Sequence, residues 1–332
     1  ASCTSTRLRA TICSSIESIQ QPTLMFCAAL GAVAGCSSVA AAAAPTSLEP
    51  SSVDLLWWVT NVSLILAPLI LIALGIQGAW KLPPSARLPA WRMPLEVGFL
   101  VFATSILLGG IGQWLFGSVL NDGDTDSALL RSDGMATIGT YLGAGIPLLG
   151  MGIVWTQLPR PVGGERPLPL AAALIFGAIA VVIGLPLIES ASALGNEIQR
   201  SIQGTEAGPI AHETLQQLFD APQSVWWWVI ALGAVIAAPI VEETLYRGIL
   251  QQSLRRLGIG RWWAILATTG LFVLIHIPVL TIEAMTGSMA ALFAAGIIFG
   301  WIREQTGRLD ASIIAHMLFN AFNLTLLMLI GG

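Results

Sequence analysis

Charged side chains are scarce in this sequence. Asp, Glu, Lys and Arg make up 10% of the 332 residues, hydrophobic residues make up 55%, and the mean hydropathy is +0.77. In an average soluble domain, about a quarter of the residues are charged. This composition excludes an ordinary soluble domain, and we expect an all-α polytopic protein embedded in a lipid bilayer.

Cysteine is missing from most of the chain. The four cysteines are Cys3, Cys13, Cys27 and Cys36. The rest of the sequence therefore has no disulfide framework, cysteine metal site or thiol nucleophile. A basic run is missing as well, and the net charge is −4, so the charge pattern does not indicate binding to nucleic acid.

Long apolar runs fill most of the sequence. A helix needs about 20 mostly apolar residues to cross a bilayer. Eight such spans are predicted, at about 55–80, 95–120, 138–157, 168–189, 225–250, 262–282, 288–303 and 311–330. We divide the chain into a leader (1–50), an N-terminal group of transmembrane helices with a polar external loop at 190–224 (51–222), and a C-terminal transmembrane core (223–332).

The leader contains a signal-like apolar segment. Arg7 and Arg9 precede an apolar, small-residue stretch from about Thr23 to Pro45, a pattern typical of a secretory signal. A ninth, uncleaved helix explains the same stretch equally well. The letters "VAGC" at 33–36 weakly resemble a lipoprotein cleavage box, with Cys36 as the lipidated residue.

The loops between the spans alternate in charge. Basic residues follow every odd-numbered span, at Lys81, Arg87, Arg92, Arg160, Arg166, Arg255, Arg256, Arg261, Arg303 and Arg308. The other loops hold acidic residues with few basic ones. Because an excess of Lys and Arg marks cytoplasmic loops, we expect the basic loops in the cytoplasm and both ends of the eight-span body outside. The expected location is the cytoplasmic (inner) membrane of a bacterium.

Ionisable residues occur inside the predicted spans, and such residues are functional candidates by default. Glu242, Glu243 and Arg247 lie in the fifth span, His276 in the sixth and His316 in the eighth. Glu242 and His276 are each 17 residues from the centre of the turn between their helices, so we expect them at the same depth.

Helical spacing brings two further pairs together. His316 and Asn320 are four residues apart and share one helix face, and Glu243 and Arg247 form an i, i+4 pair of opposite charge. A cluster of these residues is either a catalytic site or a polar network that only locks helices together.

These residues resemble the motifs of a known family. "EETLYR" at 242–247 matches the EExxxR signature of the CPBP superfamily, the Abi and type II CAAX-protease-like intramembrane proteases. Phe272 to His276 and His316 to Asn320 match its FxxxH and HxxxN motifs. The resemblance covers about residues 225 to 330, and the first four spans match only by topology.

The resemblance implies an intramembrane endopeptidase with a cavity open toward the cytoplasm, which cleaves a peptide bond with a glutamate-activated water. It implies that Glu242 is the general base and that His276 orients or activates the water. His316 and Asn320 would donate hydrogen bonds to the oxyanion, while Glu243 and Arg247 would support the first motif. A peptide or a membrane protein would be the substrate.

Other interpretations remain open at this point. Two histidines and a glutamate can ligate zinc, but the HExxH spacing is missing, so we expect neither a metal nor another cofactor. A proton- or ion-coupled transporter would use the same groups, although the inverted repeat typical of such proteins is not visible. A catalytically idle peptide-binding or immunity protein is a third alternative. The residues specify neither the substrate, prenylated or not, nor the oligomeric state.

Overall fold

The computed structural model describes residues 50–81, 94–119, 126–157, 168–204, 218, 224–280 and 282–331. The leader interpretations lie outside these residues. Within them, eight helices are long and apolar enough to cross a membrane, which confirms the all-α polytopic prediction. The longer elements are α2 (Pro50–Ile76), α3 (Leu95–Val119), α4 (Asp126–Gln157), α5 (Leu170–Gln203), α7 (Val225–Leu232), α8 (Ala238–Glu243), α9 (Gln251–Arg256), α10 (Arg261–His276), α11 (Met285–Thr306) and α12 (Leu309–Gly331).

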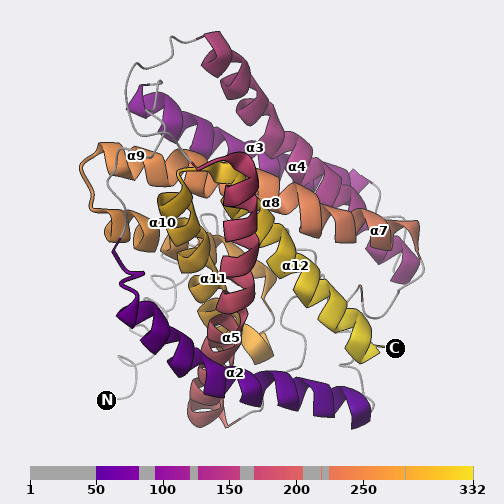
Figure 1. The fold of residues 1–332 in the computed structure, drawn as a ribbon. Coiled ribbons are helices and arrows are strands. Elements are labelled where there is room, and N and C mark those ends of the chain that lie inside the picture. Colours follow the sequence, from indigo (N-terminus) through magenta and orange to yellow (C-terminus); the bar gives the residue numbers. More distant parts are fainter. Residues whose placement is uncertain are drawn as a thin grey trace, which may run out of the picture.

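The helices surround a central group formed by α5, α10, α11 and α12 (Figure 1). The α3–α4 hairpin lies on one side of this group and α2 lies on the other, against α5 and α12. The long span that carries the EExxxR motif, α7 to α9, runs between the α3–α4 hairpin and the α10–α12 helices. The polar residues of this span therefore lie between the N-terminal and the C-terminal half of the chain.

The helix α5 differs from the prediction. A polar external loop was expected from residue 190, but the helix continues to Gln203 and ends at Gly204, whose positive φ of 69° suits glycine. At 1.5 Å per residue, its 34 residues span about 51 Å, which exceeds the hydrocarbon thickness of about 30 Å. Polar residues of its second half, among them Ser192 and Asn196, line a cavity. Farther along the expected loop, Leu218 is 1% exposed, and its carbonyl accepts a hydrogen bond from Trp227 Nε1.

The described basic residues that follow the odd-numbered spans, among them Lys81, Arg255 and Arg308, lie toward one end of the helix bundle. There, Trp262 Nε1 donates to the carbonyl of Trp80, Trp301 Nε1 donates to that of Ala79, and Leu168 N donates to that of Thr306. At the opposite end, Gln199 of α5 donates to the carbonyl of Ile282 and accepts from the backbone of Thr286. The spans therefore alternate in direction, as the loop charges predict.

Glycine permits the close contact between α3 and α4. A Cβ at Gly139 would collide with the carbonyl oxygen of Gly112, and a Cβ at Gly143 with that of Leu108. Gly139 and Gly143 form a GxxxG pattern, a spacing that lets two membrane helices touch through their backbones. This contact fixes the position of Tyr141, which lies between the two glycines.

We predict that Gly139→Ala destabilises the protein. Its new methyl group collides with the backbone of Gly112, and the collision can be relieved only if α3 moves away from α4. Overpacking of this kind lowers the free energy of unfolding by about 1–3 kcal/mol. Gly145→Ala is the matched control, since a Cβ at Gly145 has no atom within 4 Å. Thermal unfolding in detergent should show a lower midpoint only for Gly139→Ala, and equal midpoints for both variants would contradict the backbone contact.

Membrane orientation can be tested with single cysteines, in a background where the four native cysteines are replaced by serine. Ser201→Cys, exposed near the end of α5, should react with an impermeant thiol reagent from outside the cell. Leu257→Cys, at a position 54% exposed in the basic turn, should react only after the membrane is opened. The reverse pattern would show that the loop charges mispredict the orientation.

Candidate active site

The helix that carries the first motif is distorted around the two glutamates. Two π-helical segments, Gly233–Ala237 and Thr244–Leu250, flank α8. Pro239 lacks an N–H and its ring crowds the preceding turn, which explains why the first segment is widened. The backbone N–H of Ala238 bonds to Gly233 rather than to Ala234. The carbonyl of Ala234 is thereby left to accept a hydrogen bond of 2.7 Å from Asn320 Nδ2.

Glu243 and Arg247 form a fully buried ion pair. Arg247 Nη1 lies 3.1 Å from Glu243 Oε1, and both side chains are 0% exposed. Arg247 Nη2 donates to the carbonyl of Gly296 in α11 at 3.1 Å. Such a pair is stable in a low-dielectric interior only where additional interactions compensate for the lost hydration of both charges.

Three aromatic rings supply part of that compensation. The guanidinium carbon of Arg247 lies 5.0 Å from the ring centroid of Phe272, 5.6 Å from that of Phe299 and 5.9 Å from that of Tyr246. Each distance is within the range of a cation–π interaction. The arginine therefore joins its own helix to α10 and α11. A glycine is required at position 296 because a Cβ there would lie 2.7 Å from Thr269 Cγ2 and 3.3 Å from Arg247 Nη2.

His316 connects the two glutamates. Its Nδ1 lies 3.0 Å from Glu243 Oε1, where it donates to the carboxylate, and its Nε2 lies 4.0 Å from Glu242 Oε2. The ring stacks on Phe299, with centroids 4.7 Å apart and planes inclined by 20°. His316 is 4% exposed, so packing and hydrogen bonding together determine its orientation.

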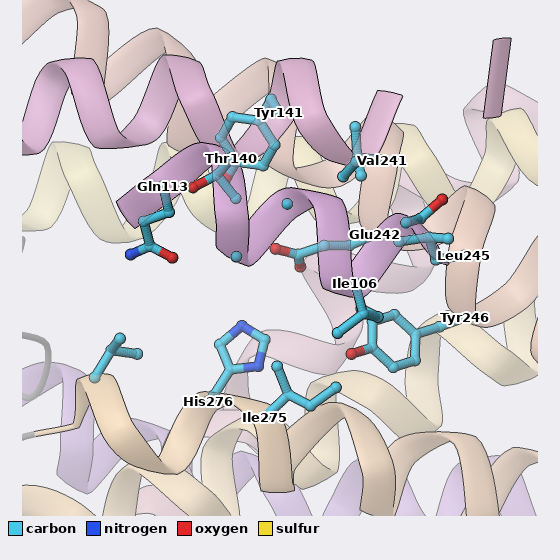
Figure 2. Close-up of a pocket in the computed structure, with 15 residues that line it drawn as sticks. Ile106, Gln113, Thr140, Tyr141, Val241, Glu242, Leu245, Tyr246, Ile275 and His276 are labelled. Atoms are coloured by element: carbon cyan, nitrogen blue, oxygen red, sulfur yellow. The ribbon is translucent and has the colours of Figure 1, made fainter. Parts of the chain in front are cut away.

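His276 faces Glu242 from α10 (Figure 2). Its Nδ1 lies 2.7 Å from the carbonyl oxygen of Phe272, and a carbonyl can only accept. In the neutral ring, the Nδ1 proton is therefore donated to Phe272 and Nε2 keeps its lone pair. Such a nitrogen can accept a hydrogen bond from a water molecule.

Two cavities meet at this cluster. The smaller one, about 210 Å³, lies between α3, α4, the first-motif helix and the end of α10. The larger one, about 780 Å³, is lined by residues of α2, α4, α5 and the C-terminal core, among them His316 and Asn320. Tyr141, Glu242 and His276 line both cavities, so Glu242 borders two cavities. Figure 2 shows these three residues in the smaller one.

The larger cavity runs toward the end of the bundle opposite the basic loops. Among its lining residues are Glu197 and Arg200 near the end of α5, and Leu327 near the end of α12. An opening to the cytoplasm and cytoplasmic basic loops were both expected from the sequence. The larger cavity extends away from the described basic residues, so only one of these two expectations can hold for it, and both stay predictions.

The structure brings together all six residues singled out in the sequence. Glu243, Arg247 and His316 form a bonded network, Glu242 lies beside His316, His276 lies across the shared cavity from Glu242, and Asn320 lines the larger cavity one turn from His316. Sequence reasoning missed two cavity-lining residues, Tyr141 and Glu189. Glu189 carries the same signal as the others, an ionisable group within a membrane helix, but the fourth span was predicted to end there. No sequence signal singled out Tyr141.

The arrangement suits acid–base chemistry on a bound molecule. It contains one carboxylate that lines two cavities, one histidine that faces it, and a second carboxylate paired with an arginine. Within the described residues, no group of three or more His, Cys, Asp or Glu side chains is arranged to hold a metal ion.

Comparison with protein families gives one finding. Residues 224–322 match the family described as type II CAAX prenyl endopeptidase, Rce1-like, and this match covers 99 of the 332 residues. Comparison with curated proteins and with solved structures gives no match. The family match includes the three motifs and every residue of the bonded network. The resemblance to CPBP-type membrane proteases is thus confirmed for the C-terminal core, where residues 224–322 match the Rce1-like family model.

Proposed function

We propose that this protein is an intramembrane endopeptidase that hydrolyses a peptide bond with a water molecule activated by Glu242. The observation that carries the proposal is the division of labour between adjacent carboxylates. Glu243 is fully buried and paired with Arg247, whereas Glu242 lines two cavities opposite His276. The Rce1-like domain supports a peptidase over a transporter built from the same groups.

The reaction begins at Glu242. Its carboxylate takes a proton from a water molecule that His276 Nε2 orients, and the oxygen of that water attacks the peptide carbonyl carbon. The carbonyl electron pair moves onto its oxygen, which becomes an oxyanion. When the tetrahedral intermediate collapses, the C–N bond breaks and Glu242 returns the proton to the leaving amine. The products are a carboxylic acid and an amine.

His316 stabilises the oxyanion. A charged imidazole donates Nδ1–H to Glu243 and directs Nε2–H toward the space beside Glu242. The separation of 4.0 Å from Glu242 Oε2 exceeds a direct hydrogen bond and leaves room for a reacting oxygen between them.

Asn320 is the second oxyanion donor. Its amide nitrogen carries two hydrogens, and one of them is donated to the carbonyl of Ala234. This bond holds the amide in place, and the second hydrogen is available to the cavity that Asn320 lines. Donors fixed in advance in this way stabilise developing charge in a low-dielectric site more effectively than mobile water does.

The substrate is a peptide or a membrane protein, and the enzyme acts within a lipid bilayer. Eight apolar helices make the protein an integral multi-pass membrane protein. The bacterial cytoplasmic membrane and access from the cytoplasm stay predictions. Labelling at Ser201 and Leu257 decides the side of access, because the larger cavity opens at the end where Ser201 lies.

Changing each of the adjacent glutamates separately tests the division of labour. Glu242→Gln keeps the shape of the side chain but removes the base, so kcat should fall by at least about 10²-fold while the unfolding temperature stays near that of the parent. Glu243→Gln leaves Arg247 buried beside a neutral partner, so the unfolding temperature should fall together with activity. The assay is cleavage of a membrane-anchored peptide, identified by comparing membrane proteomes with and without the active protein. If Glu242→Gln cleaves as fast as the parent, the mechanism fails and ion transport becomes the better hypothesis.

Metal removal provides a separate test. Glu243 pairs with Arg247 and accepts a hydrogen bond from His316 Nδ1, so its carboxylate is already engaged within the protein. The purified protein should therefore keep its peptidase activity after exhaustive dialysis against a chelator and should contain zinc well below one equivalent. A loss of activity that only added zinc restores would instead assign Glu242, His276 and His316 to ligand roles.

A further inference from the structure

A second carboxylate lies in the wall of the larger cavity, outside the three motifs. Glu189 belongs to α5, and its side chain lines the cavity of about 780 Å³ that also contains Glu242, His276 and His316. It is partly exposed to that cavity. The proposed mechanism gives it no role.

Glu189 lies at the depth of the site. On one side of α11, Gly184 approaches Ile298 and Gly195 approaches Gly287, so the antiparallel packing places Glu189 level with about Phe293. On another side of α11, Gly296 approaches Thr269 and Gly300 approaches Ile265. Counting residues along these two antiparallel helices places Phe272 of α10 level with Phe293 as well. Glu189 is therefore about one helical turn in depth from His276, and both side chains line the same cavity.

A polar track leads from the end of α5 to Glu189. Asn196 and Ser192 follow at helical spacing along the cavity wall, and Asn320 and Asn323 of α12 line the same cavity. At the far end of the track, Arg200 lies 3.6 Å from Glu197, and these two side chains are 56% and 60% exposed. A polar or charged group of a bound peptide can thus reach the depth of Glu189 without entering an apolar wall.

The charge of Glu189 has no counterpart among the described residues. Arg200, the basic residue that lines this cavity among the described residues, pairs with Glu197. No ion pair or hydrogen bond of Glu189 is found in the described part of the chain. A carboxylate at membrane depth is costly unless a cation pairs with it, and such residues mark substrate pathways.

We propose that Glu189 binds a basic side chain of the substrate, so that the enzyme prefers peptides with a lysine or arginine near the cleaved bond. This inference rests on the proposed peptidase function and names a substrate class for it. An ammonium or guanidinium group gains a charge-assisted hydrogen bond with Glu189, and the cavity is large enough to hold the extended side chain beside the peptide backbone.

A charge-swap experiment tests the proposal. Membrane-anchored peptides derived from a cleaved sequence carry Lys, Gln or Glu at each of the four positions on either side of the cleaved bond. At one position, the parent enzyme should cleave the Lys peptide with at least a tenfold higher kcat/KM than the Gln peptide. Glu189→Gln should remove this preference, and Glu189→Lys should shift it to the Glu peptide. Glu96→Gln, an equal charge change at an exposed position outside both cavities, should leave the preference of the parent intact.

The outcomes separate the two hypotheses. If the parent cleaves the Lys and Gln peptides equally at all positions, or if Glu189→Gln keeps the Lys preference with an unchanged unfolding temperature, Glu189 is not the subsite although the peptidase stands. If the parent cleaves no peptide at all, the peptidase function fails, and the assignment of Glu189 to its substrate fails with it. Should Glu189→Lys not fold, Glu189→Gln alone still decides the question.

Discussion

The arrangement of the core depends on one buried ion pair, between Glu243 and Arg247. Two fully buried charges within a membrane protein are tolerated only where other groups compensate for their lost hydration. Here the compensation comes from three neighbouring helices: a carbonyl of α11, the ring of Phe272 in α10 and the imidazole of His316 in α12. Each interaction offsets part of the free energy lost when the two charges leave water, and each also fixes the position of one helix. The pair therefore determines where the residues around Glu242 are placed.

The backbone next to the pair explains how adjacent glutamates acquire different environments. In a regular helix, neighbouring side chains diverge by about 100°, because 3.6 residues complete a turn. That divergence buries Glu243 and leaves Glu242 at the border of two cavities. The π-helical segment before them ends just ahead of Pro239, which interrupts the regular hydrogen-bond pattern. The carbonyl of Ala234 therefore accepts a hydrogen bond from Asn320. A local irregularity of one helix thus positions a residue of another.

The sequence was sufficient to predict the cluster but not its surroundings. Equal distances from a tight turn predicted that Glu242 and His276 lie at the same depth, and i, i+4 spacing predicted the pairing of Glu243 with Arg247. The extension of α5 was missed because hydropathy treats a polar stretch as a loop, whereas Ser192 and Asn196 are polar because they line a cavity. Which end that cavity faces depends on how tilted helices pack, and no single segment encodes it. The GxxxG spacing at Gly139 was present in the sequence, but only the structure shows α3 as its partner.

The claim that the buried pair organises the core can be tested most directly by a double-mutant cycle. Free energies of unfolding would be measured in detergent for Glu243→Gln, Arg247→Met and the double variant. Each single change leaves one buried group without its partner and should cost about 3–5 kcal/mol, while the double variant, which leaves no uncompensated charge, should lose clearly less than the sum. A coupling energy of at least about 1.5 kcal/mol is predicted. Additive losses would show that the two side chains act independently and would contradict the central role of the pair.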